Sequence, residues 1–421
     1  MKYKLIVFGC QMNRSDAERI ETVMNQMGYD KSENEELNDA DIAIVVACSI
    51  RQHAIDRIYG LKKRFDKIKK VRPFTTILTG CVLDADKKNM EKFFDIIFNI
   101  NDLGELPKLL DKSESLQVQE YLSIQPVYEN NFQAYIPITK GCNQFCHFCV
   151  VPYTRGREVY RDPDEIVSEC RRLVEVGYKE ITLLGQTVNS YNHKKANFSK
   201  LLQMIDAIEG DYWIRFVSSH PNFFSDDVID TWKKGTHLTP YLHLAVQSGD
   251  NEMLQKMNRK YSIEKFKDVV AKIRAVVPGV AVSTDIIVGY SGETEEHFLK
   301  TMELFREMRF DMAYISKYSI RKGTLGEKLH ADDVSYEEKK RRDAELNLVL
   351  KEVAHKNNKK LVGKNMKILV ESHSKGYWMG KSDSFKTVKI QPNENDENFA
   401  GQFVDVKIVE ALPWGLLAER V

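Results

Sequence analysis

The strongest constraint on the fold of this chain is a repeated alternation of short apolar runs with segments of helical periodicity. Residues 1–110 contain apolar runs that predict buried parallel strands, namely KLIVF, IAIVVA, TTILT and DIIFNI. Apolar residues recur at helical spacing in the segments between these runs. This pattern predicts a doubly wound α/β fold with a parallel sheet of about four or five strands.

The same rhythm restarts near Tyr135 and predicts a second α/β unit. Its apolar runs are YIPIT, EITLL, WIRFVS, YLHLAV, VAVSTDIIV and MAYISKY, with helical patterns between them. Consecutive βα units joined by right-handed crossovers curl into a partial barrel, here of the (β/α)6 type. A long charged helix is expected over SYEEKKRRDAELNLVLKEVAHKNNKKL. The short strands that follow, broken by Gly and Asn, predict a small antiparallel β-barrel.

These changes of pattern divide the chain into expected domains. The three domains are residues 1–112, 131–358 and 360–421. The polar stretch DKSESLQVQEYLSIQPVYENN, between the first two, is expected to be a linker.

The composition excludes several classes of protein. The 421 residues carry a formal net charge of +1, and their apolar and charged fractions are ordinary, which argues against a disordered chain. No apolar run approaches the length of a membrane span, so no membrane partner is expected. The opening MKYKLIVFGC turns polar at once and indicates a first strand instead of a signal peptide. A cytoplasmic location is therefore expected.

Cys142, Cys146 and Cys149 stand close together in GCNQFCHFC, directly after the first strand of the predicted barrel. A loop at this position lies at the mouth where barrel enzymes place their chemistry. Three thiolates can hold three irons of a 4Fe–4S cluster and leave the fourth iron open to chelate S-adenosylmethionine. Zinc is the competing interpretation, but it needs a fourth ligand, and only His147 is near. The pattern favours an enzyme that cleaves S-adenosylmethionine to start radical chemistry.

Cys10, Cys48 and Cys81 are distant in sequence, but each ends an apolar strand. In an open α/β sheet, ligands bind at the carboxyl ends of the strands. Three thiols on neighbouring strand ends would hold a second 4Fe–4S cluster. Taken singly, each is more typical of a small buried hydrophobic residue. Their repeated placement favours the second cluster.

The cysteine motifs resemble those of the radical-SAM superfamily, and the chain is similar to its methylthiotransferase family along nearly its whole length. The segments that carry this resemblance are GCQMNRSDAE, ACSIRQHA, GCNQFCHFCVVPYTRGRE, LGQTVNSY, SSHP, LHLAVQSG, MNRKYS and DIIVGYSGETEE. The tripeptide at 11–13 favours the branch that modifies tRNA over the branch that modifies ribosomal protein S12. Ala47, Thr187 and the VLDAD segment depart from the usual family residues, and none of these is a cysteine.

The resemblance implies a specific reaction and a set of partners. Carbon 2 of N6-isopentenyladenosine at position 37 of tRNA would receive a methylthio group, with two S-adenosylmethionine molecules and two 4Fe–4S clusters. The expected partners are a tRNA anticodon stem-loop, an electron donor such as flavodoxin or ferredoxin, and a sulfur donor, and the chain is expected to be a monomer. The alternatives are threonylcarbamoyladenosine in tRNA, an aspartate of ribosomal protein S12, or a non-catalytic RNA-binding metalloprotein.

The resemblance also implies residues that contact the cofactor. Phe148, just before the third cysteine of its motif, would lie against the adenine. Polar groups at the barrel strand ends would meet the methionine end, the ribose or the carboxylate of S-adenosylmethionine. These are Gly185, Gln186, Asn189, Ser218, Ser219, Gln247 and Arg259. Cys170, His220 and His243 are expected to be core residues.

The C-terminal module resembles the TRAM domain, a small barrel that binds RNA. Aromatic and cationic side chains alternate there, a composition expected of a contact with single-stranded RNA. They are Lys375, Tyr377, Trp378, Lys381, Phe385 and Lys386. A partly buried aromatic set on a hairpin explains the same residues equally well. The basic run from Arg57 to Arg72 could follow phosphates, although a solvated helix face is the simpler reading. Arg155 and Arg157, just past the cysteine loop, would meet substrate phosphate, shield the clusters or lie on a solvated loop.

Two cysteine trios predict about eight irons in the anaerobically reconstituted protein. Replacing Cys142, Cys146 and Cys149 with alanine should leave about half of that iron and abolish cleavage of S-adenosylmethionine. Iron analysis and chromatography of 5′-deoxyadenosine measure the two quantities. A triple variant without iron, or one that still cleaves the cofactor, would contradict the assignment of two clusters.

Overall fold

The computed structural model describes residues 1–34, 36–48, 52–110, 120–393 and 397–421. The chain forms two compact units. The first comprises residues 1–129, 139–161 and 320–329, and the second comprises residues 130–138, 162–319 and 330–421. In these described ranges, no helix is long and apolar enough to cross a membrane.

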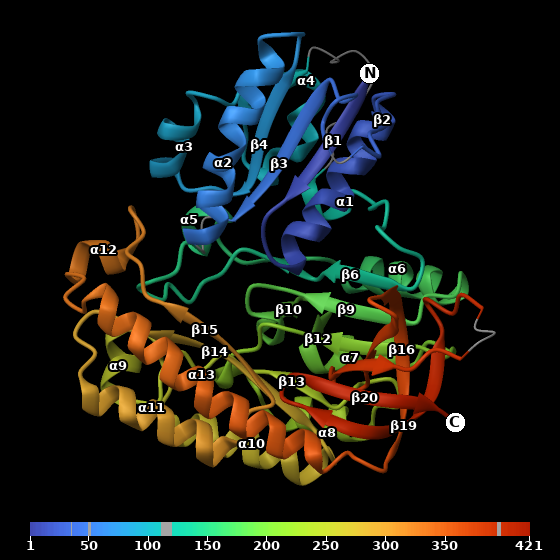
Figure 1. The fold of residues 1–421 in the computed structure, drawn as a ribbon, viewed down its shortest axis with the longest axis vertical. Coiled ribbons are helices and arrows are strands. Elements are labelled where there is room, and N and C mark those ends of the chain that lie inside the picture. The colour runs from blue at the N-terminus through green and yellow to red at the C-terminus, as the bar shows by residue number, and fades with distance from the viewer. Residues whose placement is uncertain (35, 49–51, 111–119, 394–396) are drawn as a thin grey trace. The chain divides into compact units, whose positions relative to one another are not determined.

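The first unit is built on a five-stranded sheet in which all neighbouring strands are parallel (Figure 1). In spatial order the strands are β2 (Asp30–Lys31), β1 (Lys2–Val7), β3 (Ile42–Cys48), β4 (Thr75–Cys81) and β5 (Ile96–Ile97). The direction of winding reverses between β1 and β3. Ligands of such sheets bind at this switch point, beyond the carboxyl ends of the strands.

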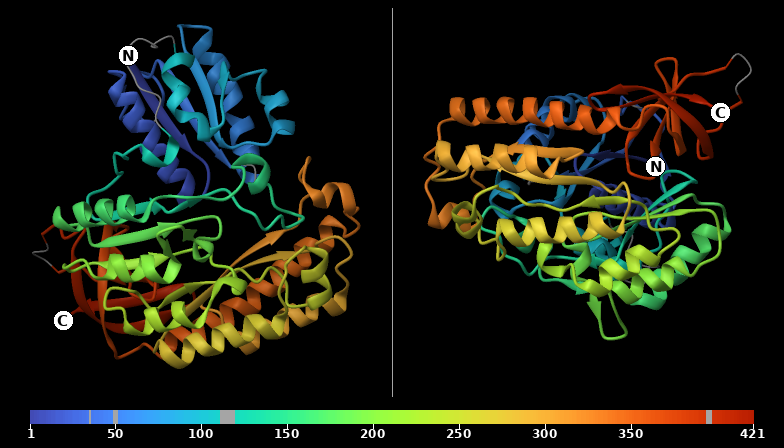
Figure 2. Two further views of the ribbon diagram at one scale, coloured as in Figure 1. Left: turned by 180° about the vertical axis from the view of Figure 1, so that it is seen from behind. Right: turned by 90° about the horizontal axis from the view of Figure 1, so that it is seen from below.

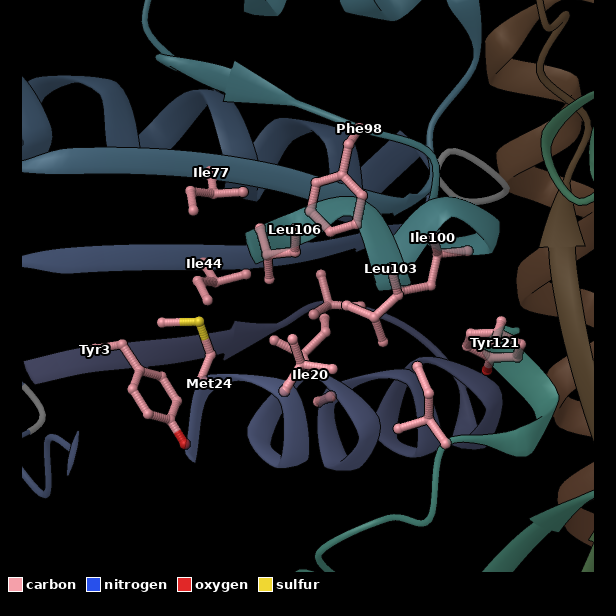
Figure 3. Packing of buried hydrophobic residues seen from close by; sticks show 14 of the residues in the cluster. Tyr3, Ile20, Met24, Ile44, Ile77, Phe98, Ile100, Leu103, Leu106 and Tyr121 are labelled. Carbon is pink, nitrogen blue, oxygen red and sulfur yellow. The ribbon is translucent and has the colours of Figure 1, made fainter. Parts of the chain in front are cut away.

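Helices cover both faces of this sheet, as the doubly wound pattern predicts. The elements are α1 (Gln11–Gln26), α2 (Gln52–Lys69), α3 (Asp84–Met90), η1 (Ile100–Glu105) and α4 (Leu106–Leu109). On one face Ile20 of α1 and Leu103 of η1 belong to one buried cluster with Ile44 and Ile77 of the sheet (Figure 3). The opposite face packs a second cluster that includes Phe65 of α2.

Part of the expected linker belongs to the first core. Residues 111–119 lie outside the described residues, but η2 (Tyr121–Ser123) follows directly. Tyr121 and Ile124 are almost completely buried and pack with the apolar cluster of α1. The prediction of a linker is therefore wrong for this stretch, because its apolar side chains are held by the first core.

The second unit contains a curved series of parallel strands. They are β6 (Gln133–Pro137), β9 (Glu180–Leu184), β12 (Trp213–Phe216), β13 (Tyr241–His243), β14 (Ala281–Val288) and β15 (Met312–Lys317). They form two three-stranded parallel sheets, which isolated parallel bridges join at Ile214–Leu238 and Ser219–Leu244. The partial (β/α)6 barrel is confirmed.

Amphipathic helices alternate with these strands. They are α6 (Pro163–Glu175), α7 (Phe198–Asp206), α8 (Asp226–Lys234), α9 (Asn251–Lys256), α10 (Ile263–Val276) and α11 (Glu295–Met308). The charged segment forms α13 (Tyr336–Lys359), which contacts α11 and β15 (Figure 2). Short elements fill the connections: η3 (Val188–Ser190), β10 (Asn192–His193), β11 (Ala196–Asn197), η4 (Pro221–Phe223) and, in the first unit, α12 (Leu325–Leu329).

The C-terminal strands close into the expected small barrel. In spatial order they are β16 (Asn365–Ser374), β17 (Tyr377–Ser382), β18 (Thr387–Ile390), β20 (Gly415–Arg420) and β19 (Phe403–Leu412). All pairs are antiparallel except β18 and β20, which run parallel. Ile368, Val388 and Val406 are among the fully buried residues that fill it.

Three of the six residues expected to contact RNA pack against other side chains of the protein. Trp378 is buried against Phe399, with their ring centroids 4.2 Å apart. The Phe385 ring lies 4.7 Å from that of Tyr241 on β13. Lys386 forms a buried ion pair with Asp311 at 2.6 Å. Phe385 and Lys386 thus join the small barrel to the βα strands, whereas Trp378 packs within the core of the small barrel itself.

A buried arginine makes the same connection. Arg215 on β12 donates its Nε to a Glu180 carboxylate oxygen at 2.6 Å and its Nη2 to the carbonyl of Ser382 at 2.7 Å. Both charged side chains of this pair are almost completely buried. Buried charges are tolerated only when they are paired and fully hydrogen-bonded. The buried charge of Arg215 is therefore satisfied only when β12 and the C-terminal barrel are packed together.

Replacing Arg215 with methionine should lower the free energy of unfolding by roughly 3–5 kcal/mol, because the Glu180 carboxylate would stay buried without its partner. Urea denaturation measures the loss. The matched control is Lys62→Met in the solvent-exposed Lys62–Asp66 pair, where a change below about 0.5 kcal/mol is expected. An effect at Arg215 as small as the control would contradict the role of this pair.

Candidate functional site

The loop with Cys142, Cys146 and Cys149 is closed at its base by a short ladder. Strand β7 (Thr139–Lys140) pairs antiparallel with β8 (Val159–Tyr160), and α5 (Val151–Thr154) lies between them in the chain. The amide of Cys142 donates to the Gly156 carbonyl at 3.2 Å, and that of Cys149 donates to the Cys146 carbonyl at 3.0 Å. Cys142 and Cys146 are buried and Cys149 is half-buried. The loop therefore presents its thiols from a defined backbone.

Gly141 allows this closure. Its φ is +75°, and a Cβ atom at this position would lie 2.1 Å from the carbonyl oxygen of Arg157. Such a distance is far below van der Waals contact, and L-residues seldom adopt this φ. Glycine is therefore required where the two ends of the loop meet.

The other trio lies at the carboxyl edge of the first sheet. Cys48 and Cys81 are direct neighbours at the ends of β3 and β4. Cys10 follows β1 at the N-cap of α1. Cys48 and Cys81 are buried, whereas Cys10 is exposed. The structure thus places all three at the expected strand ends, on both sides of the switch point.

Two polar residues of α1 hold this edge together, and the sequence assigned no role to either. The Asn13 side chain donates to the Ala47 carbonyl at 3.1 Å and accepts from the Cys10 amide at 3.3 Å. Asp16 is fully buried and forms an ion pair with Arg155. Asn13 and Asp16 are three residues apart in a helical pattern and so lie on the same helix face. This spacing is the feature of the sequence that could have indicated their shared role.

Arg155 and Cys81 are in direct contact. The guanidinium Nε donates to the Cys81 Sγ at 2.9 Å. Burial raises the pKa of the Cys81 thiol, and the Arg155 charge opposes that rise. Burial alone would lower the pKa of Arg155, but the Asp16 carboxylate raises it, so the guanidinium stays charged. Arg155 therefore lies beside the first sheet's cysteines, as a shield would, and is not exposed to phosphate.

Both trios fit the donor chemistry of iron–sulfur clusters. Among the described residues, no three His, Cys, Asp or Glu side chains converge tightly enough to hold a single metal ion. A 4Fe–4S cube needs a wider arrangement, since each thiolate binds a different iron. Each trio offers cysteines that are mostly buried, and three thiolates on such a cluster would leave one iron without a protein ligand.

The predicted cofactor contacts other than Phe148 lie in the second unit. Asn189 donates to the His220 carbonyl at 3.0 Å and accepts from the His220 amide at 2.9 Å, so it ties the loops after β9 and β12 together. Ser218, two residues after β12, and Gln247, four residues after β13, adopt positive φ values of 64° and 74°. The Ser219 hydroxyl is buried and has no hydrogen-bond partner within the described ranges.

Arg259 borders a cavity of about 360 Å³ after α9. Its Nη2 donates to the Ala245 carbonyl and its Nε to the Tyr261 hydroxyl, each at 2.9 Å. Burial and then the Arg259 charge lower the pKa of His220 to about 2, so this imidazole is neutral at physiological pH. Gly185 is buried, and Gln186 and Phe148 are half-buried.

The expected core residues are confirmed. Cys170 on α6 is fully buried. His220 is buried and caps η4 by accepting from the Asn222 amide. His243 is buried and accepts from the Ser218 amide at 3.2 Å. These histidines therefore stabilise the strand-end loops.

Comparison with known proteins gives matches along the whole chain. The radical SAM superfamily matches residues 136–305, and a family described as uncharacterized protein family UPF0004 matches residues 2–99. A protein of Clostridium botulinum (strain Langeland) is 38% identical over 98% of this chain and 96% of its own length. One of Fusobacterium nucleatum is 37% identical over 100% of both chains. Both are named tRNA-2-methylthio-N(6)-dimethylallyladenosine synthase.

A solved structure shares the fold at low sequence identity. It is the radical S-adenosylmethionine methyltransferase TsrM from Kitasatospora setae, with cobalamin and a 4Fe–4S cluster bound. The TM-score is 0.57 at 13% identity, over 75% of this chain and 74% of that one.

Replacing Gly141 with alanine should prevent the cysteine loop from closing, because the added Cβ collides with the Arg157 backbone. We expect the reconstituted variant to lose about half of its iron, the share of one cluster. Gly156→Ala is the matched control: its φ is also positive, at +77°, but its Cβ would meet no atom within 4 Å. Equal iron content in both variants would show that the close approach at Gly141 is unimportant.

Proposed function

The chain belongs to the radical-SAM methylthiotransferase family, and we propose that it attaches a methylthio group to carbon 2 of N6-isopentenyladenosine at position 37 of tRNA. Full-length relatives carry the name of this product. The observation that carries the proposal is the presence of both complete cysteine trios within one compact unit. The reaction must remove an unactivated hydrogen and deliver sulfur, and one trio would serve each of these two steps.

We assign one 4Fe–4S cluster to Cys142, Cys146 and Cys149, and a second to the trio at the sheet edge. When bound with two molecules of S-adenosylmethionine, these groups supply a radical that removes the hydrogen of carbon 2 and a methylated sulfur that replaces it. The chemistry requires an electron donor, such as flavodoxin or ferredoxin, and a sulfur donor.

The second unit supplies groups suited to S-adenosylmethionine. The buried Ser219 hydroxyl, which has no hydrogen-bond partner among the residues that the structure describes, is available to a polar atom of the cofactor, since a buried hydroxyl without a partner is costly. Arg259 offers a positive charge to the carboxylate. Ser218 and Gln247 follow barrel strands, where ligands of this fold bind. Asn189 already uses both ends of its amide on the His220 backbone, so we assign it to positioning this loop pair.

The substrate assigned here is a tRNA anticodon stem-loop. The α2 face exposes Lys62, Lys63, Arg64 and Lys67, whose charges suit phosphate contacts. On the cysteine loop, Arg157 lies over the Phe145 ring at 4.3 Å from its centroid. Aromatic and arginine surfaces of this kind stack on unpaired bases. We further propose that the protein acts as a monomer in the cytoplasm, where its tRNA substrate is found.

The test compares substrates in one assay with anaerobically reconstituted protein, S-adenosylmethionine and a reductant. We expect methylthio transfer to tRNA with isopentenyladenosine, and none to tRNA with threonylcarbamoyladenosine or to ribosomal protein S12. Mass spectrometry of nucleosides and peptides measures the products. Transfer to either of the other substrates, without transfer to the first, would refute the assignment.

The same assay separates the roles of the trios. A Cys10→Ala, Cys48→Ala or Cys81→Ala variant keeps the Cys142–Cys149 loop and should still produce 5′-deoxyadenosine, while it attaches no methylthio group. A variant lacking all three cysteines that still modified tRNA would remove the sheet-edge trio from the mechanism.

A further inference from the structure

Arg155 is a buried charged side chain with no assigned role in the proposed reaction. Its side chain is fully buried in the first unit, where an arginine is costly unless its N–H groups are satisfied. Two of its nitrogens, Nη1 and Nη2, donate to the Asp16 carboxylate, the former at 3.2 Å. The third nitrogen, Nε, donates to the Cys81 Sγ at 2.9 Å. The planar guanidinium thus binds a carboxylate and a candidate cluster ligand at the same time.

The surroundings of Arg155 fix this geometry. The Tyr121 hydroxyl also donates to the Asp16 carboxylate, at the oxygen that accepts from Arg155 Nη1. Asn99 donates to the Thr154 carbonyl and Asn101 donates to the Arg155 carbonyl, each at 3.3 Å. Hydrogen bonds therefore fix both the guanidinium and the backbone of Arg155. Little further side-chain freedom is lost when the guanidinium also donates to Cys81.

The position of Arg155 in the chain adds a second observation. It follows α5, a few residues after Cys149, so the segment that carries one trio supplies a donor to the other. Groups that hydrogen-bond to metal ligands orient those ligands and tune the metal. In iron–sulfur proteins, hydrogen bonds to sulfur and local charge set the reduction potential.

We propose that Arg155 is a positioning residue for the cluster at Cys10, Cys48 and Cys81, which it holds and tunes by donating to the Cys81 thiolate. This inference rests on the proposed function, because it takes the sheet-edge trio as a cluster site. The cationic donor stabilises the reduced, more negative cluster and raises its potential. Asp16 orients the guanidinium and offsets part of its charge.

The experiment isolates this cluster in a background where Cys142, Cys146 and Cys149 are alanine. In that background Arg155→Met should release iron to a chelator roughly 10- to 100-fold faster and shift the midpoint potential downward. Arg155→Lys keeps the positive charge but loses the planar guanidinium that donates to two partners at once. Its midpoint potential should therefore stay close to that of the parent protein, while its iron is still released faster. Chelator kinetics and a spectroscopic redox titration measure the two effects.

Two further variants separate positioning from folding. Asp16→Asn combined with Arg155→Met removes both buried charges, so it avoids an unpaired carboxylate and should show the same rapid iron release. Arg19→Met is the matched control: Arg19 is equally buried on α1 but donates to Ser15, so its loss should leave the potential unchanged.

Unchanged iron retention and potential in the double variant would overturn the proposal and leave Arg155 as a structural partner of Asp16. A shifted potential in Arg19→Met as large as that in the double variant would also overturn it, since the effect would then be nonspecific. These measurements use no tRNA, so a wrong assignment of substrate leaves them unaffected.

Discussion

A parallel sheet brings the carboxyl ends of all its strands to one edge, and the candidate chemistry of this protein depends on that constraint. Cys10, Cys48 and Cys81 are separated by tens of residues, yet each follows or ends a strand of the same sheet. In the second unit, Ser219 and Gln247 follow parallel strands in the same way. Both units therefore gather residues that are distant in sequence without any special loop.

Buried charges determine how these edges are completed. Asp16 and Arg155 satisfy each other within the first unit, and Glu180 and Arg215 do so within the second. In each case the arginine has donors left after pairing, and it uses them on a further element: the Cys81 sulfur in one unit and the Ser382 carbonyl in the other. The fork of arginine makes this double role possible, because a single ammonium group could not serve both partners in fixed directions.

Similarity of fold and similarity of sequence support different conclusions about this protein. TsrM shares the fold at 13% identity, which carries no information about the substrate. Relatives at 37% and 38% identity extend over nearly the whole chain, including the first sheet with its own cysteines. The family assignment thus rests on the complete chain, in which the second trio and the barrel occur together.

The sequence by itself determined the elements and their order, because strand and helix periodicities are local properties of the chain. It predicted the doubly wound sheet, the partial barrel, the closed C-terminal barrel and the strand-end positions of Cys10, Cys48 and Cys81. It could not predict that Arg155 turns inward to Cys81 or that Tyr121 belongs to the first core. Nor could it show that Trp378 and Phe385 are used for packing. Those outcomes depend on which buried groups find partners across long sequence separations, and only the tertiary structure decides this.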